Sequence, residues 1–131
     1  MDHGKLTRDR HGIALKLAEQ GVKIAVHYYQ NEKAAKDTLA AIRKQGAEGM
    51  IVQADVTKPT EITAMLEKVK KDFGKLDIFV SNARPEVPEF FQGPMDITLE
   101  QWNAAVDSQA KAFLVGAREA AAFMNDGGRI F

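Results

Sequence analysis

The sequence contains no cysteine, has no excess of charge of either sign and has no long apolar run. Without cysteine the chain has no disulfide, no thiolate zinc site and no cysteine nucleophile. Its 18 Lys and Arg residues balance 18 Asp and Glu residues, so no net field attracts nucleic acid or an anionic membrane. No segment approaches the ~18 apolar residues of a membrane-spanning helix, and the charged amino terminus lacks a signal peptide's apolar core. We therefore expect a soluble, cytoplasmic protein without nucleic-acid or membrane partners.

Histidine is also scarce, with only His3, His11 and His27. These residues do not form the i, i+4 pair with a nearby carboxylate that marks a helical metal site. We expect solvated histidines and no metal.

What the sequence does contain is a repeated switch between strand-like and helix-like apolar spacing. Short, nearly continuous apolar runs, typical of parallel strands buried on both faces, occupy residues 22–29, 49–56 and 76–83. Amphipathic stretches typical of helices fill the last two-thirds of residues 1–21, then 31–46, 57–74 and 98–125. Residues 127–131 look like the opening of one more strand. The pattern predicts an α/β fold, a single partial Rossmann-like domain over residues 1–131 with three full parallel strands, part of a fourth and four flanking helices.

Local signals support these helices. Asn31 is placed to cap the second helix, and Thr98 with Gln101 forms a capping box at the start of the long fourth helix. Pro59 suits the first turn of the third helix, and Gly74 its end. These boundaries follow from neighbouring residues alone.

Two polar residues follow successive predicted strands. Asp55 comes at the end of the second strand and Asn82 at the end of the third. Ligands bind beyond the carboxyl ends of strands in an open parallel sheet, so this carboxylate and amide could bond a nucleotide's base and ribose. Alternatively, both side chains have a purely structural role and stabilise the turns that follow the strands.

The segment GKLDIFVSNA (74–83) resembles the Gly-x-Leu-Asp strand and Asn-Asn-Ala-Gly turn of short-chain dehydrogenases/reductases. Asp55-Val56 before a helix, and Trp102 within a long helix, follow the same family order. The resemblance runs from about Gly12 to Phe131 and is that of the family's amino-terminal half. Within the family the sequence is similar to the acyl-carrier-protein-reductase-like members.

This resemblance implies a cofactor, NADP or NAD, and residues that meet it. Asp55 matches the acidic residue beside the adenine ring, and Val56 a neighbouring backbone contact. Asn82 and Ala83 match the turn along the cofactor. Residues 29–31 replace the acidic residue with which the family often selects NAD, which favours NADP.

Other positions depart from the family pattern. The family's Thr-Gly-x-x-x-Gly-x-Gly turn lets the backbone approach the pyrophosphate, but here Arg8 and Arg10 fall on the later two glycines. The family's catalytic Ser and Tyr-x-x-x-Lys pair have no counterpart in these residues. We therefore expect a chain that lacks the first strand and the catalytic half, with weak or absent nucleotide binding and no hydride transfer by itself.

Gln109 aligns with a fourth catalytic group of the family, an Asn on the long helix. Its spacing from Trp102, Val106 and Phe113 places it on that helix's apolar stripe, where we expect a buried amide. A buried amide needs a partner, so Gln109 either keeps a proton-relay position or bonds a neighbouring carbonyl.

Two functions from different classes follow. The first is a fragment of an NAD(P)-dependent oxidoreductase, inactive in isolation. The second is a non-catalytic binding or oligomerisation module, since family members commonly pair through the long helix, residues 98–125 here. A homo-oligomer is therefore expected.

Overall fold

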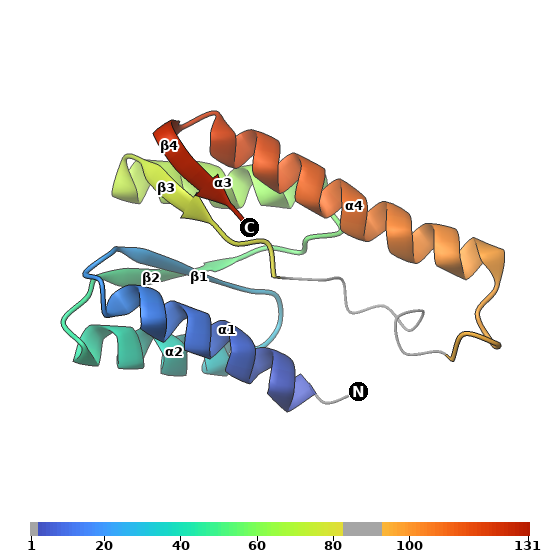
Figure 1. Ribbon diagram of the computed structural model, residues 1–131, viewed down its shortest axis with the longest axis horizontal. Helices are drawn as coiled ribbons and strands as arrows, with labels where there is room; N and C mark the ends of the chain where they lie inside the picture. The colour runs from blue at the N-terminus through green and yellow to red at the C-terminus, as the bar shows by residue number, and fades with distance from the viewer. Residues whose placement is uncertain (1–2, 83–92) are drawn as a thin grey trace. The chain divides into compact units, whose positions relative to one another are not determined.

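The computed structural model of the protein describes residues 3–82 and 93–131, with side chains from Arg10 onward. These residues divide into two compact units, Met1–Ala54 and Asp55–Phe131, which are described separately below. Both units combine parallel strands with helices (Figure 1), so the α/β class expected from the sequence is confirmed.

The first unit places two helices against one pair of parallel strands. Its elements in chain order are α1 (His3–Ala18), β1 (Ile24–Tyr28), α2 (Glu32–Lys44) and β2 (Gly49–Gln53). β1 and β2 pair in parallel from Ile24 opposite Gly49 to Tyr28 opposite Gln53. Both helices lie on the same side of this strand pair (Figure 1).

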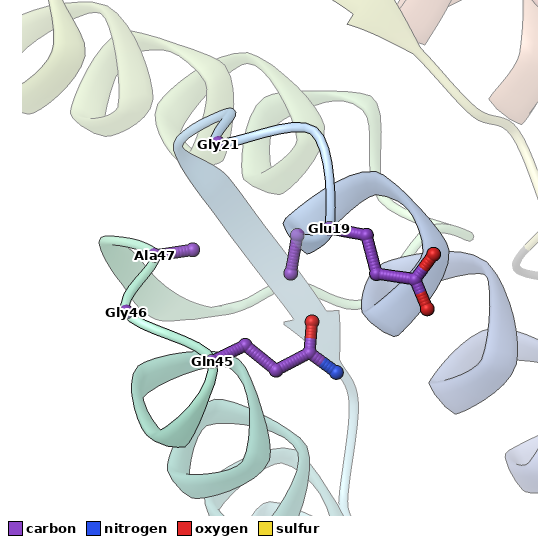
Figure 2. A pocket seen from close by; sticks show the side chains of 6 residues that line it. Glu19, Gly21, Gln45, Gly46 and Ala47 are labelled. Carbon is purple, nitrogen blue, oxygen red and sulfur yellow. The ribbon is translucent and has the colours of Figure 1, made fainter.

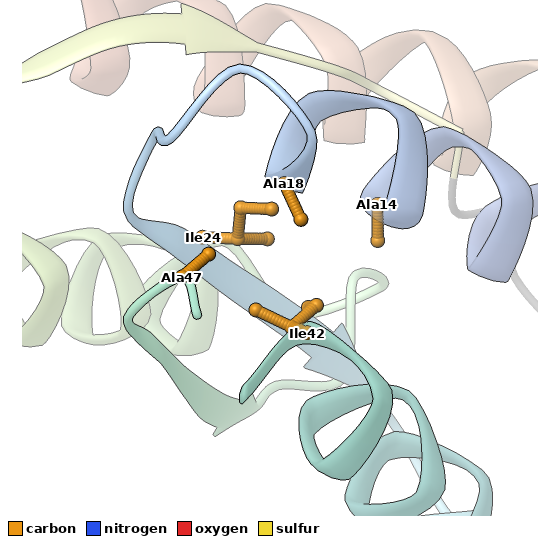
Figure 3. Close-up of a cluster of buried hydrophobic side chains, with 5 residues drawn as sticks. All are labelled: Ala14, Ala18, Ile24, Ile42 and Ala47. Atoms are coloured by element: carbon orange, nitrogen blue, oxygen red, sulfur yellow. The ribbon is translucent and has the colours of Figure 1, made fainter. Parts of the chain in front are cut away.

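The core of the first unit lies where these two helices meet β1. Small side chains of α1 close over isoleucines of β1 and α2 (Figure 3), and the cluster consists of Ala14, Ala18, Ile24, Ile42 and Ala47. Alanine on α1 allows this helix to approach closely, and burial of such apolar area supplies the main favourable term in folding.

The second unit repeats the order helix, strand, helix, strand. Its elements are α3 (Pro59–Phe73), β3 (Leu76–Phe79), α4 (Leu99–Ala121) and β4 (Met124–Ile130). β3 pairs in parallel with β4, and α4 packs on α3 and on both strands. Its buried core comprises Ile62, Leu66, Val115 and Ala120.

Most element positions and caps agree with the sequence predictions. The Asn31 side chain accepts from the amide of Ala34 at 3.0 Å, and Thr98 and Gln101 bond each other's backbone amides at 3.1 and 2.9 Å. Pro59 opens α3, and Gly74 ends it with φ +80°.

Three features of the elements differ from the predictions. The helix α1 already begins at His3, and β4 is a strand of seven residues where only the opening of one was expected. Among the described residues the strands form two pairs, whereas the sequence suggested one continuous sheet. The number of strands agrees with the expectation, and the class and the parallel pairing hold.

The expectation of a buried stripe on the long helix is wrong. Trp102, Val106 and Phe113 are 56%, 46% and 47% exposed, and Gln109 is exposed with them. The covered face of α4 carries small residues, with Ala105, Gly116 and Ala120 buried. A β-carbon on Gly116 would lie 2.8 Å from Cζ of Phe79, so close packing of α4 on β3 requires small residues there.

The expectation of solvated histidines is also wrong for the two whose side chains are described. His11 and His27 are each partly buried and hydrogen-bonded. Nδ1 of His11 lies 2.9 Å from Oγ1 of Thr38, and this hydroxyl donates to the carbonyl of Ala34 at 3.0 Å. Because the one hydroxyl proton is used in that bond, His11 is the donor, and it ties α1 to α2.

Candidate functional site

The turn after β2 is built around the carboxylate of Asp55. Its Oδ1 accepts from the amide of Thr57 at 3.0 Å and from the hydroxyl of Thr57 at 2.7 Å. The Asp55 amide in turn donates to Oε1 of Glu61 at 3.1 Å, while Oε2 of Glu61 faces Nζ of Lys58 at 3.5 Å. Asp55 thus ties down the turn into α3, and its Oδ2 takes no part in these bonds.

The same contacts keep the carboxylate charged. Partial burial acts to raise the pKa of Asp55, but the two bonds from Thr57 and the nearby charge of Lys58 outweigh it. The pKa is therefore lowered from its ordinary 3.8, and Asp55 presents a negative acceptor at neutral pH.

Val56 contributes packing to this turn. Its side chain is partly buried and lies against the core of the second unit beside α3. The predicted backbone contact of Val56 with a nucleotide stays a prediction.

Ala54, the residue before Asp55, is fully buried, and two residues of β1 hydrogen-bond to its backbone. Its amide donates to the carbonyl of Tyr28 at 3.1 Å, and its carbonyl lies 2.8 Å from Nε2 of His27. Burial lowers the pKa of His27 below 6.5; the bond to Ala54 opposes this, and the positive charge of Arg10 adds to it. His27 is therefore neutral at pH 7 and donates from Nε2 to the Ala54 carbonyl.

Sequence reasoning missed three supporting residues, Thr57, Glu61 and His27. The Asp-x-Thr spacing at residues 55–57 is a signal for a side-chain turn and could have indicated Thr57. Glu61 lies in the first turn of α3, where a carboxylate commonly accepts a hydrogen bond from a nearby backbone amide. Nothing local indicates His27, since its partner is 27 residues away.

Asn82 follows β3 and is partly buried. Its side chain makes no hydrogen bond to another residue in the described part of the chain. The preceding Ser81 is fixed through its amide, which donates to the carbonyl of Phe131 at 2.8 Å. Ala83 lies outside the described residues, so the predicted contact of Asn82 and Ala83 with a cofactor stays a prediction.

Gln109 is exposed and is therefore not the buried amide that its spacing predicted. Within residues 93–131 its side-chain amide has no hydrogen-bond partner. Its proton-relay role remains a prediction.

The positions that align with the family's pyrophosphate turn are helical here. Residues 3–18 form one continuous helix, which includes both arginine positions. Beyond the first turn of a helix each backbone N–H is used by a carbonyl four residues earlier. Arg8 and Arg10 lie beyond the first turn, so their N–H groups are used within the helix and are not available to a pyrophosphate as those of a glycine-rich turn are.

The first unit also has a shallow hollow of about 470 Å³ (Figure 2). Glu19 and Gln45 line it, together with Gly21, Gly46 and Ala47. These residues follow α1 and α2 and precede β1 and β2. The hollow therefore lies at the amino ends of these strands, opposite the carboxyl ends where ligands bind in such folds.

Within the described residues there is no group of three or more His, Cys, Asp or Glu side chains that could hold a metal ion. No helix there is long and apolar enough to cross a membrane.

Comparison with known proteins gives consistent matches. Residues 11–131 match the family model described as enoyl-(acyl carrier protein) reductase. The hydroxynaphthalene reductase-like protein Arp2 of Metarhizium brunneum (strain ARSEF 3297) is 34% identical over 119 residues, which are 91% of this chain and 43% of that protein. The 1-cyclohexenylcarbonyl-CoA reductase of Streptomyces collinus is 34% identical over 118 residues, 90% of this chain and 41% of that protein. The chain thus spans less than half the length of these curated relatives.

Solved structures agree in fold. A short-chain dehydrogenase of Burkholderia cenocepacia J2315, in complex with NADP, matches with a TM-score of 0.78 and 30% identity, over 92% of this chain and 49% of that one. The reductase LugOII, described as catalysing a keto-reduction at C1 in lugdunomycin biosynthesis, matches with a TM-score of 0.76 and 33% identity over the same shares.

Proposed function

The chain belongs to the short-chain dehydrogenase/reductase family, and from this premise we propose that it is part of an NAD(P)-dependent oxidoreductase and inactive in hydride transfer by itself. Its contribution is the adenine side of the cofactor site. The NADP-bound relative supports NADP as the cofactor of the complete enzyme.

The observation that carries this proposal is the turn at Asp55. Two bonds from Thr57 fix its Oδ1, and the carboxylate stays charged. Oδ2 is then the atom that accepts from the amino group of adenine. A charged acceptor of this kind contributes about 1.5–3 kcal/mol to binding, roughly a 10- to 100-fold change in affinity.

The helical conformation at the start of α1 limits the affinity of the chain for NADPH. Without a glycine-rich turn the pyrophosphate lacks its backbone donors, so the chain binds NADPH weakly. The catalytic Ser and the Tyr-x-x-x-Lys pair have no match among these residues, which supports the absence of turnover.

Titration with NADPH and then NADH, followed by NMR of the backbone amides, tests the proposal. We expect shifts at the amides of residues 55–57 without saturation, and no oxidation of NADPH with carbonyl substrates. Asp55→Asn keeps the Oδ1 bonds of the turn but removes the charge, so it should abolish the shifts. Asp77→Asn removes an exposed carboxylate of β3 and should leave them unchanged.

Either of two results would contradict this function. One is measurable turnover by the pure chain. The other is equal NADPH-induced shifts in the Asp55→Asn and Asp77→Asn proteins, which would remove Asp55 from the site.

A second candidate function, oligomerisation, rests on the outer face of α4. Leu99, Trp102, Val106, Phe113 and Leu114 are all exposed there. Apolar residues gathered along one helix commonly mark an association surface. We propose that this stripe pairs with the same stripe of a second copy, which would make the long helix a homo-oligomer contact.

A further inference from the structure

We propose that Asp126 is a site of spontaneous modification, at which the aspartate converts to isoaspartate. The residue belongs to the segment Asn125-Asp126-Gly127-Gly128 within β4. It is the one aspartate in the sequence that a glycine follows. The reaction joins a side-chain carboxyl to the next backbone nitrogen, and glycine has no β-carbon to obstruct that approach.

The backbone around Asp126 is not held by the strand ladder. Leu76 of β3 lies opposite Met124 of β4, but Ile78 already lies opposite Arg129. Two steps along β3 thus correspond to five along β4, and residues 125–128 form a bulge without partners in β3. Such an irregularity leaves its backbone N–H groups outside the ladder.

Exposure and conformation also favour the reaction. Asp126 and Gly127 are both exposed, so water reaches the carboxyl and the peptide. Gly127 adopts φ +89°, a conformation that other residues rarely reach, and Asp-Gly pairs are typical of turns. The side chain of Arg129 donates to the Gly127 carbonyl at 3.4 Å and so contacts the next peptide along the chain, not the Asp126–Gly127 peptide.

The chemistry needs only water. The Gly127 nitrogen loses its proton and attacks Cγ of the protonated Asp126 carboxyl, which leaves one oxygen as water and closes a five-membered succinimide. Water then adds to the former main-chain carbonyl carbon of Asp126 and breaks its bond to the Gly127 nitrogen. The main chain now runs through the side-chain carbon, and the former main-chain carbonyl is a free carboxylate. Nothing is oxidised or reduced.

The other described aspartates are protected in distinct ways. Asp55, Asp77 and Asp96 precede the β-branched residues Val56, Ile78 and Ile97, which crowd the attacking nitrogen. The aspartates at 9, 37, 72 and 107 lie in helices, where the following amides are bonded to carbonyls one turn earlier. Conversion should therefore be confined to Asp126.

Conversion has a structural consequence within the second unit. It adds one carbon to the backbone directly before Gly127-Gly128. A β-carbon at Gly128 would lie 2.8 Å from Sδ of Met124, so Gly128 packs closely against this side chain and a displaced backbone would require Met124 to move. Since Met124 packs against the core of α3 and α4, the change should loosen the β3–β4 pairing.

Ageing of the purified protein at neutral pH, followed by trypsin digestion, tests the proposal. Cleavage after Arg118 and Arg129 releases the peptide EAAAFMNDGGR, in which isoaspartate is separated by chromatography and assigned by electron-transfer fragmentation. We expect an isomer of unchanged mass at Asp126 and none at Asp77. Asp126→Glu keeps the charge but requires a larger ring, so it should stay unmodified.

A synthetic EAAAFMNDGGR peptide aged in parallel makes the test decisive. Conversion in the folded protein at a rate comparable to that of the peptide supports the proposal. Conversion in the peptide but not in the protein would show that the bulge protects Asp126 and would overturn it, as would a change confined to Asn125.

Discussion

His27 shows how a single partly buried side chain links β1 to the residue that follows β2. Its Nε2–H donates to the carbonyl of Ala54, and Arg10 faces it from α1. Both burial and the neighbouring positive charge oppose protonation, so the pKa of His27 is lower in the folded chain than in the unfolded one.

The first prediction concerns pH. The unfolded chain takes up a proton on His27 near its ordinary pKa of 6.5, whereas the folded chain takes it up only at lower pH. The stability that depends on neutral His27 is thus fully present above pH 6.5 and is lost as the pH falls below it. Urea unfolding at a series of pH values between about 8 and 5 measures this loss.

The matched control is His27→Gln, whose amide can still donate to Ala54 but does not titrate. Its free energy of unfolding should change less than that of the wild type over this range. Parallel curves for the two proteins would show that His27 does not set the pH dependence.

At the scale of single elements, α4 is placed by small residues. Gly116 faces Phe79 so closely that a β-carbon would lie 2.8 Å from Cζ and 3.3 Å from Cε1. The buried residues of α4 are Ala105, Val115, Gly116 and Ala120, and Gly116 allows the helix to approach β3 closely.

The second prediction compares two glycines in helices. Gly116→Ala should lower the free energy of unfolding by about 1–3 kcal/mol, because Phe79 must move within a packed core. Gly12→Ala in α1, where nothing lies within 4 Å of the new β-carbon, should raise it by about 0.5–1 kcal/mol through helix propensity. Denaturant unfolding of both variants measures the difference, and a stabilising Gly116→Ala would contradict the described packing.

At the scale of the whole molecule, the exposed apolar stripe of α4 is the surface through which we expect two copies to associate. Leu99 and Leu114 are 82% and 60% exposed, in addition to the three stripe residues described above. A single exposed leucine is ordinary, but a row of five along one helix is not.

The third prediction concerns this surface. The wild-type chain should elute as an oligomer. Phe113→Glu combined with Trp102→Glu should yield the monomer, because the introduced carboxylates of the two copies would face each other in a symmetric contact. Light scattering after size exclusion gives the mass. Met95 is an exposed apolar residue before α4, and the control substitution Met95→Glu should leave the oligomer intact. A monomeric wild type would exclude the association module.

The sequence by itself determined the class of the fold, its family and the local boundaries of its elements. The caps at Asn31 and Thr98 and the stop at Gly74 depend on residues within one helical turn, so their signals are complete in the sequence. A turn role for Asp55 was one of the two alternatives that the sequence left open, although its partner Thr57, two residues away, was missed.

Only the tertiary structure decided which faces are covered and what supports the site. Gly116 meets Phe79 across 37 positions of the chain. His27 reaches Ala54 across 27 positions, and the bulge in β4 depends on its register with β3. Local periodicity cannot show whether an apolar stripe is covered along its whole length, because only the packed partner decides which part of the stripe is buried.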